Sequence, residues 1–470
     1  MIIFLPYRNL FSEHDFSVTT WLVKALLFFR GGYRYLLSLN SVSSTSGRRS
    51  VWVSSVLPFN IALGPVSTLV QLLILNFNGT VVEVGLALTL FSAVSVPSAL
   101  FWGFVTDRFQ QRRPLILASF LITSLILVLF LFVRTGYWVS ILYALFSFAI
   151  TASTTPLNLL VMETEQKPKW ASAFAKFSMI ASVGQTLGLL LGMVWSFYIP
   201  LDILVIPLAV SSLVSAGLAA FLIKEPQIVF ERQVLVMDKQ SFFHRLRQSP
   251  YLFLKFPHPH DFKRIFRNLR LELIRHTGLL YLAIFGFFLS SGIFNASLVP
   301  ALDASGVSNL LVFSVIMIGL IVQIISFRFA GSFTEQNSPV KSAILALVLR
   351  AVALGLIGVF AYFLTGFWFL LIVLVFYPLA AGVAYSIYYT ASNTMVFHSL
   401  SPRRNGSSLG VYSALAGAAT MVGSFSSGFL SFYGGFFLTF IISAGCLIVS
   451  AWLLSLINGS MANVEALTSG

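Results

Sequence analysis

Side chains that could bind a solute lie singly within long apolar stretches of this sequence. Two Asn pairs recur at one separation, because 295 − 60 and 393 − 158 both equal 235. A carboxamide donates and accepts hydrogen bonds, which suits recognition of an uncharged polar molecule. Two Gln amides and two phenols are further candidates. The eight substrate-path candidates are Asn60, Asn295, Asn158, Asn393, Gln185, Gln323, Tyr377 and Tyr385.

Each candidate also has a purely structural interpretation. The amides of Asn60 and Asn295 could bond to a neighbouring helix instead, and we weight this equally with solute recognition. Pro65 and Pro300, five residues after each Asn, would kink those two helices. Asn158 and Asn393 could equally cap helix ends.

The residues needed for catalysis or metal binding are poorly represented. All six His fall outside the apolar stretches, and the acidic residues nearest to them, Glu83, Asp202 and Asp303, sit at their ends. Such a distribution argues against an enzyme and against a proton relay within the membrane. The run 257–261 (PHPHD) lacks a third or fourth metal ligand at a suitable spacing, so we interpret it as a loop. No Gly-Lys-Ser/Thr phosphate loop occurs, and we expect no cofactor.

The composition indicates the environment of these residues. Of 470 residues, 29 are basic and 15 acidic, so only 9% are charged, against about 25% in a soluble domain. Apolar residues make up 57%, and the mean hydropathy is +0.90. The 47 Phe exclude a disordered chain, and a single Cys446 excludes a disulfide framework. A membrane protein with many spans is the class that remains.

The spacing of the charges predicts an all-α protein with twelve membrane spans. A span needs about 20 apolar residues. Eight charge-free gaps hold one span each. The segments 342–402 and 405–464 hold two each, with turns at Thr365-Gly366 and at Tyr433-Gly434-Gly435. If the N-terminus is inside, 27 of the 29 basic residues fall on the inner side. We therefore predict a plasma-membrane protein with both termini cytoplasmic.

The spans form two groups of six around one long basic stretch. We expect an N-terminal extension over 1–50 with an interfacial helix, a first half over 51–223, a cytoplasmic linker over 224–277 with a surface helix, a second half over 278–457, and a tail over 458–470. Matches at the offset of 235 recur across four spans, for example Gly188 with Gly423. The halves are therefore predicted to be pseudo-symmetric repeats in parallel orientation.

The loop after the second span carries a recognisable pattern, Gly103-x-x-x-Asp107-Arg108 followed by Arg112-Arg113. It resembles the signature loop of the major facilitator superfamily, although Gln110 and Gln111 depart from that pattern. The resemblance covers about 51–457. It implies the twelve-helix fold, a central cavity and alternating access. The fifth span lacks the Gly-Pro pair found in many drug antiporters.

This loop is also the predicted inner gate. Gly103 would allow close approach of spans 2 and 11, and Asp107 would cap a neighbouring helix. Arg108, Arg112 and Arg113 would pair with Asp107 or with Glu163. The alternative is that these arginines only mark the cytoplasmic side. Arg350, inside span 9, we interpret as snorkelling to the cytoplasmic face.

Three functions follow in order of preference. The first is a transporter, compatible with export, that moves a small neutral or amphipathic solute by alternating access. The second is a sensor or receptor of transporter ancestry that transports nothing. A proton-coupled drug antiporter is less favoured, and a membrane enzyme ranks last. The expected partners are the lipid bilayer and a small-molecule substrate; no nucleic acid or obligate protein partner is indicated.

Overall fold

The computed structural model describes residues 51–109, 112–164, 170–223, 277–399 and 405–468, and every element in these ranges is a helix. The interfacial helix predicted within 1–50 and the surface helix predicted within 224–276 lie outside these ranges. Within these ranges, eleven helical stretches are long and apolar enough to cross a membrane. The chain is therefore an integral membrane protein, as its composition predicts.

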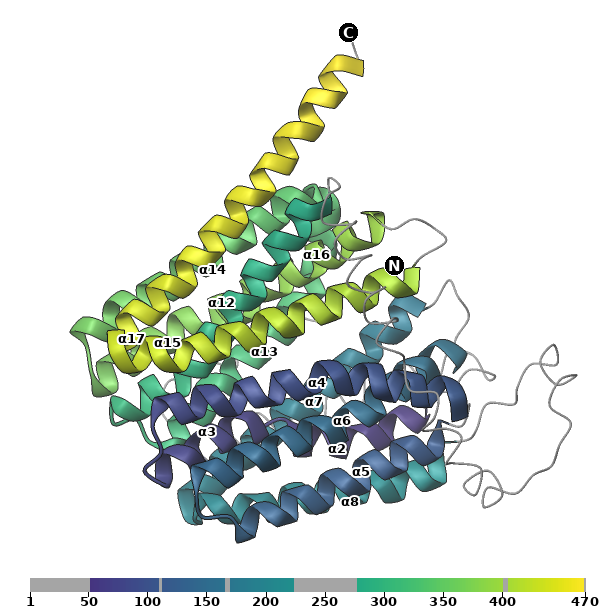
Figure 1. Cartoon of the computed structure of the whole chain (residues 1–470), viewed down its shortest axis with the longest axis vertical. Helices are drawn as coiled ribbons and strands as arrows, with labels where there is room; N and C mark the ends of the chain where they lie inside the picture. Colours follow the sequence, from purple (N-terminus) through teal and green to yellow (C-terminus); the bar gives the residue numbers. More distant parts are fainter. Residues whose placement is uncertain (1–50, 110–111, 165–169, 224–276, 400–404, 469–470) are drawn as a thin grey trace, which may run out of the picture. The chain divides into compact units, whose positions relative to one another are not determined.

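The first six spans precede residue 224. Pro65 divides the first span, because proline has no N–H to continue the helical hydrogen bonds. The elements are η2 (Val51–Ser55), α2 (Val56–Leu63), α3 (Val66–Asn76), α4 (Val81–Phe109), α5 (Arg113–Leu129), η3 (Phe130–Phe132), α6 (Gly136–Thr164), α7 (Trp170–Tyr198), η5 (Leu201–Leu204) and α8 (Val205–Leu222). In Figure 1, α5 and α8 run side by side.

The last six spans follow residue 276. The tenth is composite, with a π-helical segment between two α-helices. The elements are α12 (Thr277–Ala304), α13 (Asn309–Gln336), α14 (Pro339–Phe363), α15 (Gly366–Tyr377), the π-helical η7 (Pro378–Ala384), α16 (Tyr385–Ser399) and α17 (Asn405–Thr468).

The predicted number of twelve spans is confirmed, because α17 is two helices joined by a sharp turn. Its apolar part, Leu415–Leu456, has 42 residues, which at about 1.5 Å per residue is roughly twice the thickness of the hydrocarbon layer. The turn lies at Gly435, whose φ of 70° is non-helical. Gly366, between α14 and α15, has φ 61°. Both predicted turns therefore lie where glycine permits a left-handed backbone.

The packing repeats between the two groups of spans. Gly188 on α7 packs against the Ile61 carbonyl on α2, and Gly423 on α17 packs against the Leu289 carbonyl on α12. These two glycines are the pair predicted at the offset of 235. Small residues let membrane helices approach closely. The internal repeat is therefore visible as equivalent contacts between spans 5 and 1 and between spans 11 and 7.

Hydroxyl groups add polar links between α12 and α17. The Ser290 and Ser443 hydroxyls lie 2.8 Å apart, and the Ser297 hydroxyl contacts those of Ser427 and, at 2.8 Å, Ser431. All five side chains are buried. Such interhelical hydrogen bonds satisfy polar groups that lipid cannot.

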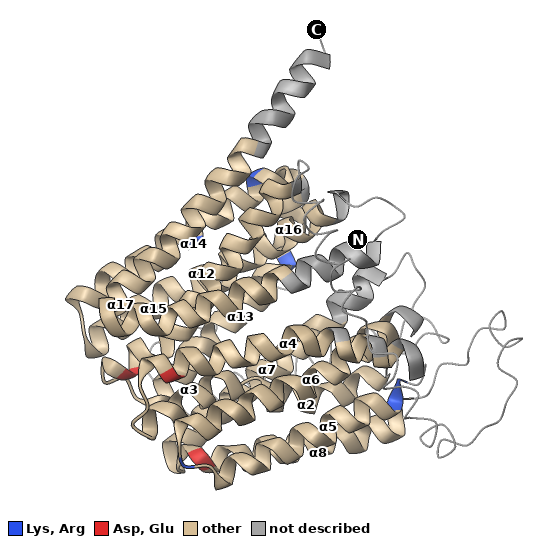
Figure 2. Ribbon diagram, in the orientation of Figure 1, with Lys and Arg blue, Asp and Glu red and all other residues tan. Residues whose placement is uncertain are grey.

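Charges separate to opposite ends of the spans (Figure 2). We call the helix ends that carry Glu83, Asp202 and Asp303 the acidic end, and the opposite ends the basic end. Asp202 accepts a hydrogen bond from Arg134 at 2.9 Å across that acidic end. Arg134 is thus one of the two basic residues that do not fall on the inner side in the charge pattern of the sequence.

Contacts between the two groups of spans concentrate toward the acidic end. Gly85 on α4 faces the Gly428 backbone on α17, and Gly192 on α7 faces the Phe313 ring on α13. At Gly103, nearer the basic end, no described atom comes within 4 Å of where a Cβ would lie. Spans 2 and 11 approach closely at Gly85, where Gly428 opposes it; the side chains of span 11 from 405 to 414, nearer the basic end, lie outside the described residues, so the close approach predicted at Gly103 stays a prediction.

Candidate functional site

The Asn60 amide forms hydrogen bonds to protein groups, as its structural interpretation predicts. The side chain is 6% exposed, and its Nδ2 donates to the Val56 carbonyl at 2.9 Å. Gln185 on α7 donates from Nε2 to the Asn60 Oδ1 at 3.5 Å. Gly184, beside Gln185, leaves room for the Asn60 Cβ. Asn60 therefore helps to join α2 and α7, while Gln185 remains half-buried.

Asn295 has different surroundings, although it is the repeat equivalent of Asn60. From 290 to 302 every residue of α12 is buried except Asn295, which is exposed. No side chain or backbone group in the described ranges forms a hydrogen bond with its amide. An exposed residue on a helix surrounded by protein faces an opening between helices, because the neighbours that contact lipid would be exposed too. Asn295 is thus the candidate best placed to meet a solute.

The other three candidate amides are those of Asn158, Asn393 and Gln323. Asn393 donates to the Tyr389 carbonyl of its own helix at 2.8 Å, which agrees with a local backbone role. Asn158 on α6 is half-buried. Gln323 on α13 is also half-buried, and its backbone carbonyl accepts a hydrogen bond from the Ser386 hydroxyl at 3.2 Å. Its backbone N lies near Gly382 of the π-helical segment.

Aromatic rings from α12, α13 and α16 form a continuous group that we call the aromatic cluster: Phe287, Phe327, Tyr385, Tyr388 and Tyr389. Phe287 stacks on Tyr388 with centroids 3.9 Å apart, and Tyr385 stacks on Tyr389 at 5.8 Å. Phe327 meets Tyr385 and Tyr389 edge-on. Tyr377, at the other side of the π-helical segment, is buried and stacks on Phe294 at 6.1 Å.

The π-helical segment decides where Tyr385 points. Phe367 is 65% exposed, and Tyr385 follows it by 385 − 367 = 18 residues, or five α-helical turns. An uninterrupted helix would place both side chains on the same face. A π turn holds about one residue more than an α turn, so side chains beyond it rotate by roughly 100°. Tyr385 therefore lies in the aromatic cluster, half-buried, rather than on the face of Phe367.

Arg350 is buried in the protein, so the prediction that it snorkels to the cytoplasmic face is wrong. It is the twelfth of 25 residues in α14 and only 3% exposed. Its guanidinium carbon lies 4.7 Å from the Phe287 ring centroid and 5.7 Å from that of Tyr385. The Nε and Nη1 atoms are completely buried without a hydrogen-bond acceptor among the described residues. Mid-helix position and surrounding rings keep the side chain from either membrane surface.

The predicted inner gate is described only in part. The side chains of Asp107, Arg108 and Glu163 lie outside the described residues. Arg112 donates from Nη1 to the Thr106 carbonyl at 3.0 Å, and Arg113 donates to the Ala220 carbonyl at the end of α8. Both bonds stay within the first six spans, where they tie helix ends together.

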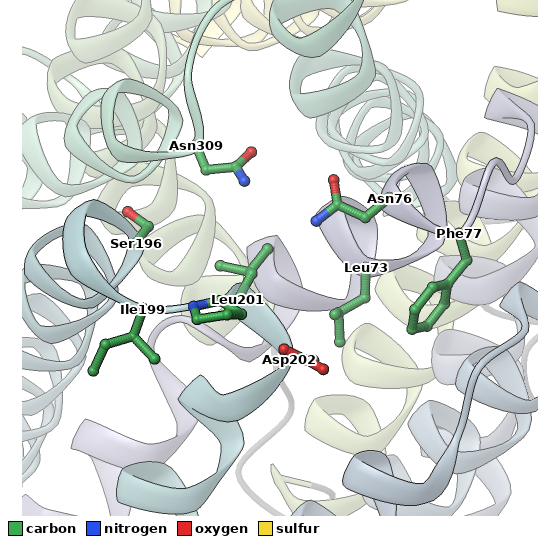
Figure 3. A pocket seen from close by; sticks show the side chains of 9 residues that line it. Leu73, Asn76, Phe77, Ser196, Ile199, Leu201, Asp202 and Asn309 are labelled. Atoms are coloured by element: carbon green, nitrogen blue, oxygen red, sulfur yellow. The ribbon is translucent and has the colours of Figure 1, made fainter.

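A pocket of about 370 Å³ opens at the acidic end. Its walls come from α3, α7, η5 and α13, hence from both groups of spans. Figure 3 shows the amides of Asn76 and Asn309 facing the same space, with Asp202 on one wall. The Ser196 hydroxyl donates to the Met193 carbonyl of its own helix at 2.9 Å. Sequence reasoning did not select Asn76 or Asn309, because Asn at a helix end most often serves the backbone.

One family profile and several solved structures match this chain. The profile of the Major Facilitator Superfamily matches residues 52–376. A search of curated proteins finds no match. The nucleoside transporter NupG matches with a TM-score of 0.61 at 15% identity, over 88% of this chain and 99% of that one.

Two other solved structures are similar. A bacterial homologue of the human lysosomal transporter Spinster, inward-facing and occupied, has a TM-score of 0.65 at 13% identity, with coverage of 87% and 95%. A mutant of the peptide transporter POT in complex with sulfate has a TM-score of 0.66 at 12% identity, with coverage of 88% and 94%. At these identities the structures show the shared fold alone.

Proposed function

The chain belongs to the major facilitator superfamily and is a membrane transporter of that family, and we propose that it moves a small neutral or amphipathic solute by alternating access. Asn295 carries the proposal, because it is the one exposed side chain in a buried stretch of α12. A polar amide that faces an opening in the middle of a bundle can exchange hydrogen bonds with a passing solute.

The contacts between the two groups of spans support a state closed at the acidic end. Gly85 with Gly428 and Gly192 with Phe313 hold that end together, whereas Gly103 has no described neighbour within 4 Å of a Cβ. Alternating access requires the reverse arrangement in a second state. Opening would have to separate these glycine contacts, and that makes them the proposed outer gate.

We propose the plasma membrane as the location, with both termini cytoplasmic and the basic end facing the cytoplasm. Export is the direction to test first. Mid-span acidic residues are absent from the sequence, so facilitated diffusion is favoured over proton coupling. The substrates in the names of the similar structures differ from one another and therefore indicate no single substrate.

Flux measurements test the proposal. Purified protein would be screened by thermal shift against a metabolite and drug library, and each stabilising compound would be followed into proteoliposomes. We expect flux of at least one compound that falls about tenfold or more in Asn295→Ala. Asn337→Ala, which changes an exposed amide at the end of α13, is the matched control. A protein that binds compounds and moves none would favour the sensor and refute the transporter.

A further inference from the structure

Arg350 is a positive charge in the middle of a span, and the described residues provide it with no negative partner. Guanidinium groups are protonated under all ordinary conditions, so this charge cannot be removed by releasing a proton. Phe287 and Tyr385 stabilise it through their ring faces at 4.7 Å and 5.7 Å. A ring face is a weaker hydrogen-bond acceptor than an oxygen atom. The Nε and Nη1 atoms therefore remain buried without a described hydrogen-bond acceptor.

No carboxylate in the described part of the chain is placed to pair with Arg350. Glu83, Asp202 and Asp303 lie at the acidic end, and Asp202 already pairs with Arg134 at 2.9 Å. No other Asp or Glu of the sequence falls within the middle of a span. A bound anion would supply the acceptor of matching charge that the described residues lack.

The aromatic cluster supplies a route to this charge. Tyr385 covers the guanidinium, is itself only half-buried, and stacks on Tyr389, which is 41% exposed. One ring therefore separates Arg350 from accessible space. Rotamer changes of a tyrosine are far smaller than the helix movements of alternating access. No basic residue lies in the middle of α5, the corresponding span of the first group, so the charge belongs to the second group of spans alone.

We propose that Arg350 binds the carboxylate of an amphipathic organic anion whose apolar part lies on the aromatic cluster. The inference rests on the proposed function and narrows its substrate class. A carboxylate accepts charge-assisted hydrogen bonds from a guanidinium, and these are strong where water is excluded. A neutral ligand would leave the charge uncompensated, and an inorganic anion would not use the rings.

Binding of matched acid and amide pairs tests this. The probes are benzoate with benzamide, 4-phenylbutyrate with 4-phenylbutanamide, and indole-3-acetate with indole-3-acetamide. Calorimetry or thermal shift on detergent-solubilised full-length protein gives the affinities. We expect at least one acid to bind roughly ten- to a hundredfold more tightly than its amide. That preference should vanish in Arg350→Gln and persist in part in Arg350→Lys. Arg328→Gln, at a helix end of the same group, is the control.

The outcomes separate the two proposals. If no acid binds better than its amide, or if Arg350→Gln keeps the preference, the inference is refuted whatever the protein transports. If inorganic phosphate binds as tightly as the acids, the organic part of the inference is refuted. If the acids bind through Arg350 but do not cross the membrane of proteoliposomes, the inference stands and the transport proposal fails.

Discussion

Replacement of Arg350 by methionine should make the ligand-free protein more stable. Burying an ion costs several kcal/mol even after relaxation, and each unsatisfied N–H adds about 1–3 kcal/mol. Nε and Nη1 are two such groups. The rings at 4.7 Å and 5.7 Å return about 2 kcal/mol and about 1 kcal/mol. The balance remains unfavourable, so Arg350→Met, which keeps a long unbranched side chain, should gain about 1–3 kcal/mol.

Thermal unfolding in detergent, followed by intrinsic tryptophan fluorescence, measures this gain. With an unfolding entropy of about 2.1 cal/mol/K per residue, the midpoint of a chain of 470 residues shifts by about 1 °C per kcal/mol, so it should rise by about 1–3 °C. Arg328→Met removes the same charge from an exposed site about two turns before the end of α13 and should leave the midpoint within about 0.5 °C. A midpoint that falls by several degrees in Arg350→Met would show that Arg350 has a stabilising partner, and the reasoning would then be wrong.

Three further predictions concern packing and the acidic end. Gly188→Val should lower the unfolding midpoint by several degrees, since its side chain would collide with the Ile61 carbonyl. Gly435→Ala should cost about 1 kcal/mol in the same assay, because a φ of 70° is unfavourable for residues with a Cβ. Asp202→Asn should change stability by less than about 1 kcal/mol, because its partner Arg134 is 65% exposed; a larger, salt-insensitive loss would contradict this.

The sequence predicts the fold well because the physical signals are strong and local. Charge-free stretches of sufficient length give the spans, and turn glycines at 366 and 435 give their ends. The repeat is also readable, since Gly188 and Gly423 must both be small for equivalent helices to touch. These features depend on composition and spacing rather than on details of packing.

The candidate site is less predictable, because equivalent residues can have different neighbours. Asn60 and Asn295 match in the repeat, yet Gln185 occupies the amide of Asn60 while Asn295 is exposed. Tyr385 would be assigned to the wrong face by helical periodicity, because the π-helical segment before it is not encoded by a recognisable pattern. The close approach at Gly85 depends on Gly428, which is far away in sequence and which no local pattern identifies as its partner.

Because the spans contain so few charged residues, the presence of Arg350 in the middle of α14 is informative about function. A chain with so few acidic residues within its spans could place an apolar residue at 350, since the middle of α5, the corresponding span of the first group, carries no charge. An apolar residue there should be more stable, so stability alone does not account for Arg350. Natural proteins accept such local costs where a site needs them. Burial of the uncompensated Arg350 charge destabilises the ligand-free state, and binding of an anion would remove this destabilisation. Differential binding of this kind is what couples a substrate to the equilibrium between two conformations.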